Sequence, residues 1–379
     1  MSQPTTSYRI LVLPGDHVGP EVMAEALKVL DVVEACRPSL RFSRTFALAG
    51  GLSIDAHGVP VTPAVLDQAA ASDAVLFGSV GGPEWAARPG PTAESGLLAL
   101  RRRLDAFANI RPCEVFVPAA SPLRPERAAG ARFVVVRENC GGAYFGDKVE
   151  EEGVASDLWV YRSGEVERCA RVSAAVARML GRDGRGGGGG PAVVWSSDKA
   201  NVLASGRLWR RVTQRVFDDE FPDIELRHQL ADSMAMLMVK DPTMFNGVIH
   251  TDNTFGDILS DISGGIAGTL GTLPSASVCG IPGSGRCNGI YEPVHGSAPD
   301  ISGKGVVNPV AQILSLAMML RYSFLLTEEA SAIEQAVGRV IDERGNGGLE
   351  VRTRDLGDTA STADVGNAVC TAVRDILTK

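Results

Sequence analysis

The stretch His250-Thr-Asp-Asn-Thr-Phe-Gly-Asp-Ile-Leu-Ser-Asp261 places two carboxylates, Asp257 and Asp261, four positions apart. Asp252 is a suitable N-cap, so the stretch predicts a helix that continues to about residue 266. Residues four apart share one face of a helix, and two like charges there destabilise it unless a cation binds between them. Oxygen ligands of this kind favour Mg²⁺ or Mn²⁺. A solvated acidic face is the alternative interpretation of the same spacing.

The composition is that of an ordinary globular protein. The chain has 379 residues, of which 45% are hydrophobic and 22% charged, and its net charge is −8. This length predicts two or three domains, and the acidic balance disfavours nucleic acid and anionic membranes as partners. We find no apolar stretch of about 18 residues and no signal-peptide pattern, so we expect no membrane association. Seven scattered cysteines without a CxxC pair favour a cytoplasmic location.

Short apolar runs alternate with helical patterns, which is typical of an α/β fold. Residues 8–14 predict a first strand and residues 20–36 a helix, but the turn between them is not GxGxxG, so a Rossmann fingerprint is absent. Gly81 and Gly82 follow an apolar strand at 74–80, where open α/β sheets bind ligands. Further strands are predicted at 40–46, 132–139, 191–196 and 225–229, and further helices at 63–71, 94–101, 166–180, 232–238, 309–326, 328–343 and 362–377.

Four segments give less regular predictions. Residues 157–162 alternate and predict a hairpin or arm, and residues 291–308 predict a long loop. Asp198-Lys-Ala-Asn201 predicts the cap of a helix that continues to about residue 217. The glycine-rich run 184–190 predicts a flexible surface loop without a function.

Nine short segments, in this order, carry a resemblance to a known family: Leu13-Pro-Gly-Asp16 with Gly19-Pro-Glu21, Gly78-Ser-Val-Gly-Gly-Pro83, Leu97-Leu-Ala-Leu-Arg101, Asn109-Ile-Arg-Pro112, Val136-Arg-Glu138, Gly142-Ala-Tyr-Phe-Gly146, Asp198-Lys-Ala-Asn201, Phe255-Gly-Asp-Ile-Leu-Ser-Asp261 and Glu292-Pro-Val-His-Gly-Ser-Ala-Pro-Asp300. With them the chain resembles, over nearly its whole length, the isocitrate and isopropylmalate dehydrogenases, a family of β-decarboxylating dehydrogenases. His17, where many relatives have glycine, is similar to fungal members. The resemblance implies the two-domain isocitrate/isopropylmalate dehydrogenase-like α/β fold.

The resemblance also implies a small-molecule substrate with two carboxylates and a 2-hydroxyl. Arg101, Arg111 and Arg137 match the family's carboxylate clamps, and a guanidinium pairs bidentately with a carboxylate. Arg137 follows three valines, which is an unusual place for a surface arginine. By contrast, we expect Arg102 and Arg103 to be solvated.

The same resemblance implies the residues of the chemistry. Asp232, Asp257 and Asp261 match three ligands of Mg²⁺ or Mn²⁺, and Asp232 also lies at the substrate. Lys199 matches the residue that accepts the hydroxyl proton, and Tyr144 the acid that protonates the enol left by decarboxylation. Taken alone, Lys199 is more often a solvated helix residue, and Tyr144 is more often a packing aromatic. In the family, Lys199 and Asp232 would come from the neighbouring subunit of a homodimer, and residues 157–162 would form an intersubunit clasp.

For the cofactor, the resemblance implies NAD. Its expected contacts are Gly81, Gly82, Glu94, His295, Gly296, Ser297, Ala298, Asp300 and Asn308. His295 would stack on adenine, and the backbone of residues 296–298 would approach the phosphates. Asp300 would bind the adenosine ribose and repel a 2′-phosphate, which favours NAD over NADP. Taken alone, His295 is more often a satisfied core or loop histidine.

The expected substrate is 3-isopropylmalate, of the leucine pathway. Leu97 and Leu98 offer an apolar pocket, to which Val202 would add from the partner chain; Asn201, beside it, is also expected to bind the substrate. Isocitrate carries a third carboxylate, and burying it against leucines would cost several kcal/mol. Another 3-substituted malate, tartrate and D-malate remain alternatives. A non-catalytic regulatory subunit is disfavoured because the acid–base and metal residues are all present.

We expect two domains with interrupted connectivity. Residues 1–106 and 270–379 would bind the cofactor, and residues 107–269 would carry the metal and dimer contacts. The substrate would lie in the cleft between them, and closure would expel water.

Overall fold

The computed structural model describes residues 5–86, 88–184 and 190–379. The chain divides into two compact units. The first comprises Met1–Leu104, Thr269–Ala276 and Cys287–Lys379, and the second comprises Asp105–Gly268 and Ser277–Arg286. This division differs from the expected domain boundaries mainly at residues 277–286, which belong to the second unit. Most of the glycine-rich run 184–190 lies outside the described residues.

The first unit contains a sheet with the strand order β2-β1-β3-β12-β11. Strands β1, β2, β3 and β12 run parallel. The strands are β1 Thr6–Gly15, β2 Leu40–Phe46, β3 Ala74–Ser79, β12 Gly289–Pro293 and β11 Pro274–Val278, of which β11 ends in the second unit. The helices are α1 Gly19–Cys36, α2 Gly51–His57, α3 Pro63–Ala71, α4 Pro83–Ala86, α5 Ala93–Leu104, α11 Val310–Tyr322, α12 Thr327–Ile341 and α13 Thr362–Leu377.

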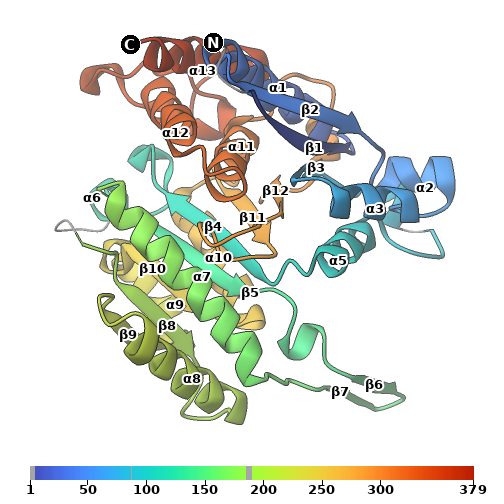
Figure 1. Cartoon of the computed structure of the whole chain (residues 1–379), viewed down its shortest axis with the longest axis vertical. Helices are drawn as coiled ribbons and strands as arrows, with labels where there is room; N and C mark the ends of the chain where they lie inside the picture. Colours follow the sequence, from blue (N-terminus) through green and yellow to red (C-terminus); the bar gives the residue numbers. More distant parts are fainter. Residues whose placement is uncertain (1–4, 87, 185–189) are drawn as a thin grey trace. The chain divides into compact units, whose positions relative to one another are not determined.

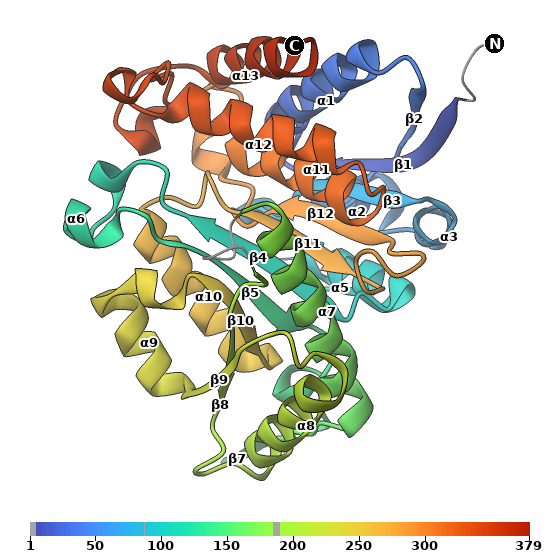
Figure 2. The ribbon, with the colours of Figure 1, turned by 60° about the vertical axis from the view of Figure 1, so that its left-hand side comes forward.

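Helices cover both faces of this sheet (Figures 1 and 2). Helices α1, α11, α12 and α13 pack together as one layer, and α3 and α5 pack on the opposite face. Alternate residues of β1, Leu11 and Leu13, meet Phe77 of β3 and Leu100 of α5 in one buried cluster. Their burial fixes α5, and with it the residues at 94–101, against the sheet.

The second unit contains the strand order β4-β5-β10-β8-β9. Strand β4 is antiparallel to β5, and the other pairs are parallel. The strands are β4 Ala108–Glu114, β5 Arg132–Glu138, β10 Gly247–Thr251, β8 Val194–Asp198 and β9 Leu226–Leu230. The helices are α6 Pro125–Ala128, α7 Ser163–Arg182, α8 Ala204–Glu220, α9 Ala231–Lys240 and α10 Asn253–Ala267. Helices α7 and α8 cover one face of these strands, and α9 and α10 the other (Figures 1 and 2).

Three expectations from the sequence need correction. The hairpin is formed by β6 Lys148–Glu151 and β7 Val154–Asp157, not by residues 157–162; both strands are fully exposed, so neither has a buried face that would produce an alternating pattern. Asp198 ends β8 instead of capping the next helix, which begins at Ala204. Residues 291–293, expected in a loop, form the buried end of β12. None of the helices among the described residues combines the length and apolar character that crossing a bilayer requires.

Candidate active site

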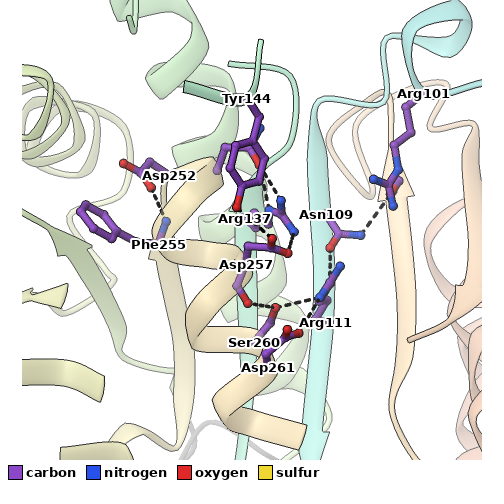
Figure 3. A network of polar contacts seen from close by, with 12 residues as sticks. Arg101, Asn109, Arg111, Arg137, Tyr144, Asp252, Phe255, Asp257, Ser260 and Asp261 are labelled. Carbon is purple, nitrogen blue, oxygen red and sulfur yellow. Dashed lines mark hydrogen bonds and ion pairs between the residues drawn. The ribbon is translucent and has the colours of Figure 1, made fainter. Parts of the chain in front are cut away.

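The acidic face of α10 is the centre of a network of polar contacts in the second unit (Figure 3). Asp252 caps the helix, as expected, because its side chain accepts a hydrogen bond from the backbone N–H of Phe255 at 2.9 Å. Asp257 and Asp261 follow on one helical face, with 36% and 75% of their side chains exposed. The two carboxylates are therefore partly open to solvent and lie beside the face of the helix that packs on β4 and β5.

Arg137 reaches this face from the end of β5. Its side chain is almost completely buried, forms an ion pair with Asp257, and donates from Nε and Nη2 to Oδ1 of Asn253 at 3.0 and 2.7 Å. A Cβ at Gly256 would lie 2.6 Å from Cγ of Arg137, so the glycine lets the helix approach the arginine. The expectation that Arg137 does not belong to a solvated surface is confirmed.

Tyr144 points its hydroxyl at the same carboxylate. Its Oη donates to Oδ2 of Asp257 at 3.1 Å, and the guanidinium of Arg137 lies 5.7 Å from the centre of its ring. Partial burial, and then the negative charge of Asp257, raise the pKa of Tyr144 above its usual value. The phenol is therefore protonated at neutral pH and has a proton to donate.

Arg111, on β4, meets α10 one turn beyond Asp257. It donates from Nη1 to Oγ of Ser260 at 2.8 Å and lies 3.8 Å from Oδ1 of Asp261. Its Nε donates to Oδ1 of Asn109 at 2.6 Å, and Asn109 in turn donates to Oγ of Ser277 at 3.0 Å. Figure 3 shows Arg111 and Arg137 beside successive turns of the helix.

Lys199 and Asp232 form a separate pair in the same unit. Lys199 Nζ lies 2.7 Å from Oδ2 of Asp232, and this ammonium lowers the pKa of the Asp232 carboxyl below its usual value. Asn201 and Val202 lie in the exposed turn that follows Lys199. Among residues 5–86, 88–184 and 190–379, no three acidic, histidine or cysteine side chains converge as a metal site. A single chain therefore brings Asp257 and Asp261 together, but not Asp232 with them.

In the first unit, α5 carries four of the expected residues. Glu94, Leu98 and Arg101 follow each other at helical spacing, and Leu97 is partly buried against the core. Arg101 is largely buried and pairs with Glu292 at 3.0 Å, whereas Arg102 and Arg103 are exposed, as expected. Leu98 is 43% exposed, so an apolar side chain on this helix is presented to solvent.

The loop at Gly81 is shaped by its backbone. Gly81 has φ +104°, and its N–H donates to Oδ2 of the fully buried Asp16 at 2.9 Å. Its carbonyl accepts from Oγ of Ser297 at 2.7 Å, and a Cβ at this position would lie 2.5 Å from Oε1 of Glu94. The structure therefore brings Gly81, Glu94 and Ser297 together. Gly82 follows directly, with its Cα beside Glu84 and His17.

The loop after β12 carries the remaining cofactor candidates. Ala298 adopts a left-handed conformation, with φ +40°, and Asp300 is exposed. Nδ1 of His295 lies 2.9 Å from the carbonyl of Gly296, and burial lowers the pKa of His295, so its ring is neutral near pH 7. Asn308 is buried and already engaged: its Oδ1 accepts from Val310 N–H, and its Nδ2 donates to Asp355, each at 3.0 Å.

Comparison with known proteins decides the family. The model of the isocitrate/isopropylmalate dehydrogenase family matches residues 9–369. The chain belongs to this family. Like its relatives, this isocitrate/isopropylmalate dehydrogenase family member is an oxidoreductase, a β-decarboxylating dehydrogenase.

Curated relatives and solved structures agree with this assignment. The family member is 68% identical to a 3-isopropylmalate dehydrogenase of Hapsidospora chrysogena, over 98% of this chain and 98% of that relative. It is 50% identical to a 3-isopropylmalate dehydrogenase of Sordaria macrospora, over 98% of this chain and 99% of that relative. The crystal structure of isocitrate dehydrogenase from Methylococcus capsulatus matches with a TM-score of 0.78 at 30% identity, over 97% of this chain and 99% of that one. The expected fold is therefore confirmed.

Several polar residues of this family member were not expected from the sequence. Asp16 accepts from the backbone N–H groups of Gly51, Leu52 and Gly81, and so joins three turns. Asn109 and Ser260 orient Arg111. Asp16 and Asn109 belong to segments quoted for the resemblance, and Ser260 lies between the two α10 aspartates. Their positions in the sequence could therefore have marked them as residues of the site. Most of their hydrogen bonds join residues that are distant in the sequence, so the sequence alone does not predict these bonds.

Proposed function

We propose that this family member oxidatively decarboxylates (2R,3S)-3-isopropylmalate to 2-oxo-4-methylpentanoate with NAD, in leucine biosynthesis. The convergence of Arg111, Arg137 and Tyr144 on the acidic face of α10 carries this proposal. The names of its fungal relatives support this choice of substrate. Leu97 and Leu98 support it as well, because they give α5 an apolar surface beside Arg101.

The donor set on α10 fits a hard divalent cation. Asp257 and Asp261 supply carboxylate oxygens from adjacent turns, and we propose that Asp232 of a second subunit supplies the third. When bound, Mg²⁺ or Mn²⁺ would polarise the 2-hydroxyl and the ketone that oxidation produces. Arg137 now neutralises Asp257, so a cation there would compete with the guanidinium and leave it available to a substrate carboxylate.

The remaining steps are assigned to side chains of the chain itself. In its neutral form, Lys199 of the neighbouring subunit would accept the proton of the 2-hydroxyl, and C2 of the substrate would lose a hydride, which NAD would accept when bound. Arg101, Arg111 and Arg137 hold the two carboxylates, one of which leaves as carbon dioxide. Tyr144 would then donate its proton to C3 of the enolate that the loss of carbon dioxide leaves, a role for which its raised pKa keeps the phenol protonated.

We propose that NAD is held in the first unit by the residues at Gly81, Glu94 and His295–Asn308. The left-handed Ala298 and the open surroundings of Gly296 leave backbone accessible to phosphate groups. The exposed carboxylate of Asp300 is available to ribose hydroxyls and disfavours the 2′-phosphate of NADP. Because Asn308 already accepts from Val310 and donates to Asp355, it would offer a ligand its second amide proton and the second lone pair of Oδ1.

We also propose that the protein is a homodimer. Helices α9 and α10 pack on each other and expose large apolar side chains, Met236 at 60%, Val239 at 49% and Ile258 at 53%. A second copy would cover this surface and bring Lys199 and Asp232 of one subunit to the α10 face of the other. The exposed hairpin β6–β7 carries Val149 and Val154, which suit an arm that packs on a partner.

Steady-state kinetics test the proposal. NADH formation is measured with 3-isopropylmalate, isocitrate, D-malate and tartrate, each with Mg²⁺ and with NAD or NADP. We expect 3-isopropylmalate with NAD to have the highest kcat/KM, by about 100-fold or more over isocitrate, because the side chains of Leu97 and Leu98 cannot pair with a third carboxylate. Higher kcat/KM with isocitrate, or with NADP, would overturn the assignment. Arg101→Met should abolish most of the activity, whereas Arg103→Met, its exposed neighbour, serves as the matched control.

A further inference from the structure

The turn that carries Lys199 is held by one face of α8. Strands β8 and β9 pair in register, with Asp198 opposite Leu230, so Lys199 and Asp232 both follow the ends of neighbouring strands. The carbonyl of Lys199 accepts from the N–H groups of Val202 and Leu203 at 3.0 and 2.9 Å. This tight turn leads directly into α8.

The first turns of α8 fold back on this segment. A Cβ at Gly206 would lie 2.7 Å from the carbonyl carbon of Lys199, so only glycine permits this approach. The next residue, Arg207, donates from Nη1 to the carbonyls of Ala200 and Val202 at 3.4 and 3.2 Å. These contacts hold the backbone of Lys199 itself and of the residues that follow it.

Arg210 adds a charged contact at the base of the turn. Its Nε and Nη2 donate to the two oxygens of Asp198 at 2.9 and 3.0 Å, and Asp198 is 1% exposed. Oδ1 of Asp198 also accepts from the backbone N–H of Ala200 at 2.8 Å, and Nδ1 of His228 lies 4.0 Å from Oδ2. The fork thus holds a buried carboxylate whose other bond fixes the residue immediately after Lys199.

We propose that Arg210 is a positioning residue for Lys199, acting through the carboxylate of Asp198. Without the guanidinium, Asp198 is left as a buried charge without its cation, and the turn rearranges to reach water. Lys199 then leaves the place where it meets Asp232. As a statement about the reaction, this inference rests on the proposed function of Lys199 as the base.

The first test needs no turnover. A carbodiimide activates the exposed Asp232 carboxyl, and the Lys199 amine displaces the resulting urea to form an amide, with net loss of one water. Mass spectrometry of the digested full-length enzyme measures the yield of this internal cross-link. We expect the wild type and Arg211→Met, the exposed neighbour on α8, to cross-link alike and Arg210→Met to cross-link several-fold less. Equal yields in wild type and Arg210→Met, or no cross-link in the wild type, would overturn the proposal.

The second test measures the reaction. In Arg210→Met, we expect kcat to fall by about 10- to 100-fold with KM for the hydroxy acid nearly unchanged, because a small misplacement of a base slows chemistry more than binding. Deuterium at the carbon that loses hydride should slow this variant more than it slows the wild type, and Arg210→Lys should be intermediate. A merely structural role would lower the active fraction without changing the isotope effect, and that result would contradict the proposal.

Two outcomes separate this inference from the proposed function. If the wild type oxidises none of the tested hydroxy acids, the proposed function fails while the cross-link still decides the role of Arg210. If Arg210→Met does not fold, a double variant that combines Asp198→Asn with Arg210→Gln replaces it. This double variant removes both charges and leaves no unpaired buried ion at the turn. Loss of the cross-link in the double variant supports the positioning role, and a wild-type yield contradicts it.

Discussion

Two candidate sites differ in the groups that form their polar contacts: the acidic face of α10 in the second unit, and the loop at Gly81 in the first. On α10 the polar groups are side chains with opposite charges, such as Asp257 and Arg137, carried by a regular helix and strand. At Gly81 they are backbone groups held by Asp16 and Ser297 in a conformation with positive φ. The first arrangement depends on charge, and the second on the absence of a Cβ.

The largest effect is expected for Asp257→Asn. The substitution keeps the shape of the side chain but removes the charge that pairs with Arg137 and would bind a cation. We expect kcat/KM to fall by about 1000-fold or more, because electrostatic groups at a reaction centre have effects of this order. Steady-state kinetics with 3-isopropylmalate measure it. Asp219→Asn, on the exposed part of α8, is the control, and a loss below tenfold would contradict a charge-based site.

Gly81→Ala tests the backbone side of the comparison. Its φ of +104° and the contact with Glu94 should destabilise the fold by about 1–3 kcal/mol and raise KM for NAD. Urea unfolding and NAD titration measure both quantities. Gly338→Ala, on α12 with open space around it, should instead stabilise the protein by about 0.5–1 kcal/mol. Equal stability of the two variants would show that backbone conformation does not distinguish the sites.

A pH titration tests the buried acids beside the α10 site. Burial raises the pKa of Asp252 from 3.8 to about 7 and that of Glu138 from 4.5 to about 7. The folded state therefore binds protons more tightly than the unfolded state. This contribution to stability is complete below about pH 4 and is lost as the pH rises through about 7.

Asp252→Asn keeps an N-cap but cannot ionise. We expect it to be about 1–2 kcal/mol more stable than the wild type at pH 8 and to lose part of the pH dependence between 5 and 8. Chemical unfolding at several pH values measures this, with Asp218→Asn as an exposed control. The prediction would be contradicted if the free energy of unfolding of the wild type increased from pH 5 to pH 8 and Asp252→Asn showed the same slope.

The smallest effect is expected for Gly296→Ala. A Cβ there meets open space, so the free energy of unfolding should change by less than about 0.5 kcal/mol. If the phosphates of NAD approach this backbone, KM for NAD should still rise by about two- to fivefold. This rise corresponds to a loss of less than about 1 kcal/mol of binding free energy. An unchanged KM would place the cofactor elsewhere and would confine the role of backbone in the first unit to Gly81.

Much of the α10 site follows from local sequence. The cap at Asp252 and the shared face of Asp257 and Asp261 are consequences of helical period, and the structure confirms that helix. Arg137 was recognisable because a charged residue at the end of an apolar strand needs a partner. The exposed hairpin at 148–157 was misplaced because strands without a buried face leave no hydrophobic pattern.

The sequence by itself determined the family, the fold class and the residue types that bind acids and cations, because these depend on composition, period and short motifs. Tertiary structure alone decided which carboxylate each arginine meets: Arg137 pairs with Asp257, Arg101 with Glu292 and Arg210 with Asp198. These partners lie between 12 and 191 positions apart in the chain. Their distances depend on how strands and helices pack, and local propensity contains no information about that packing.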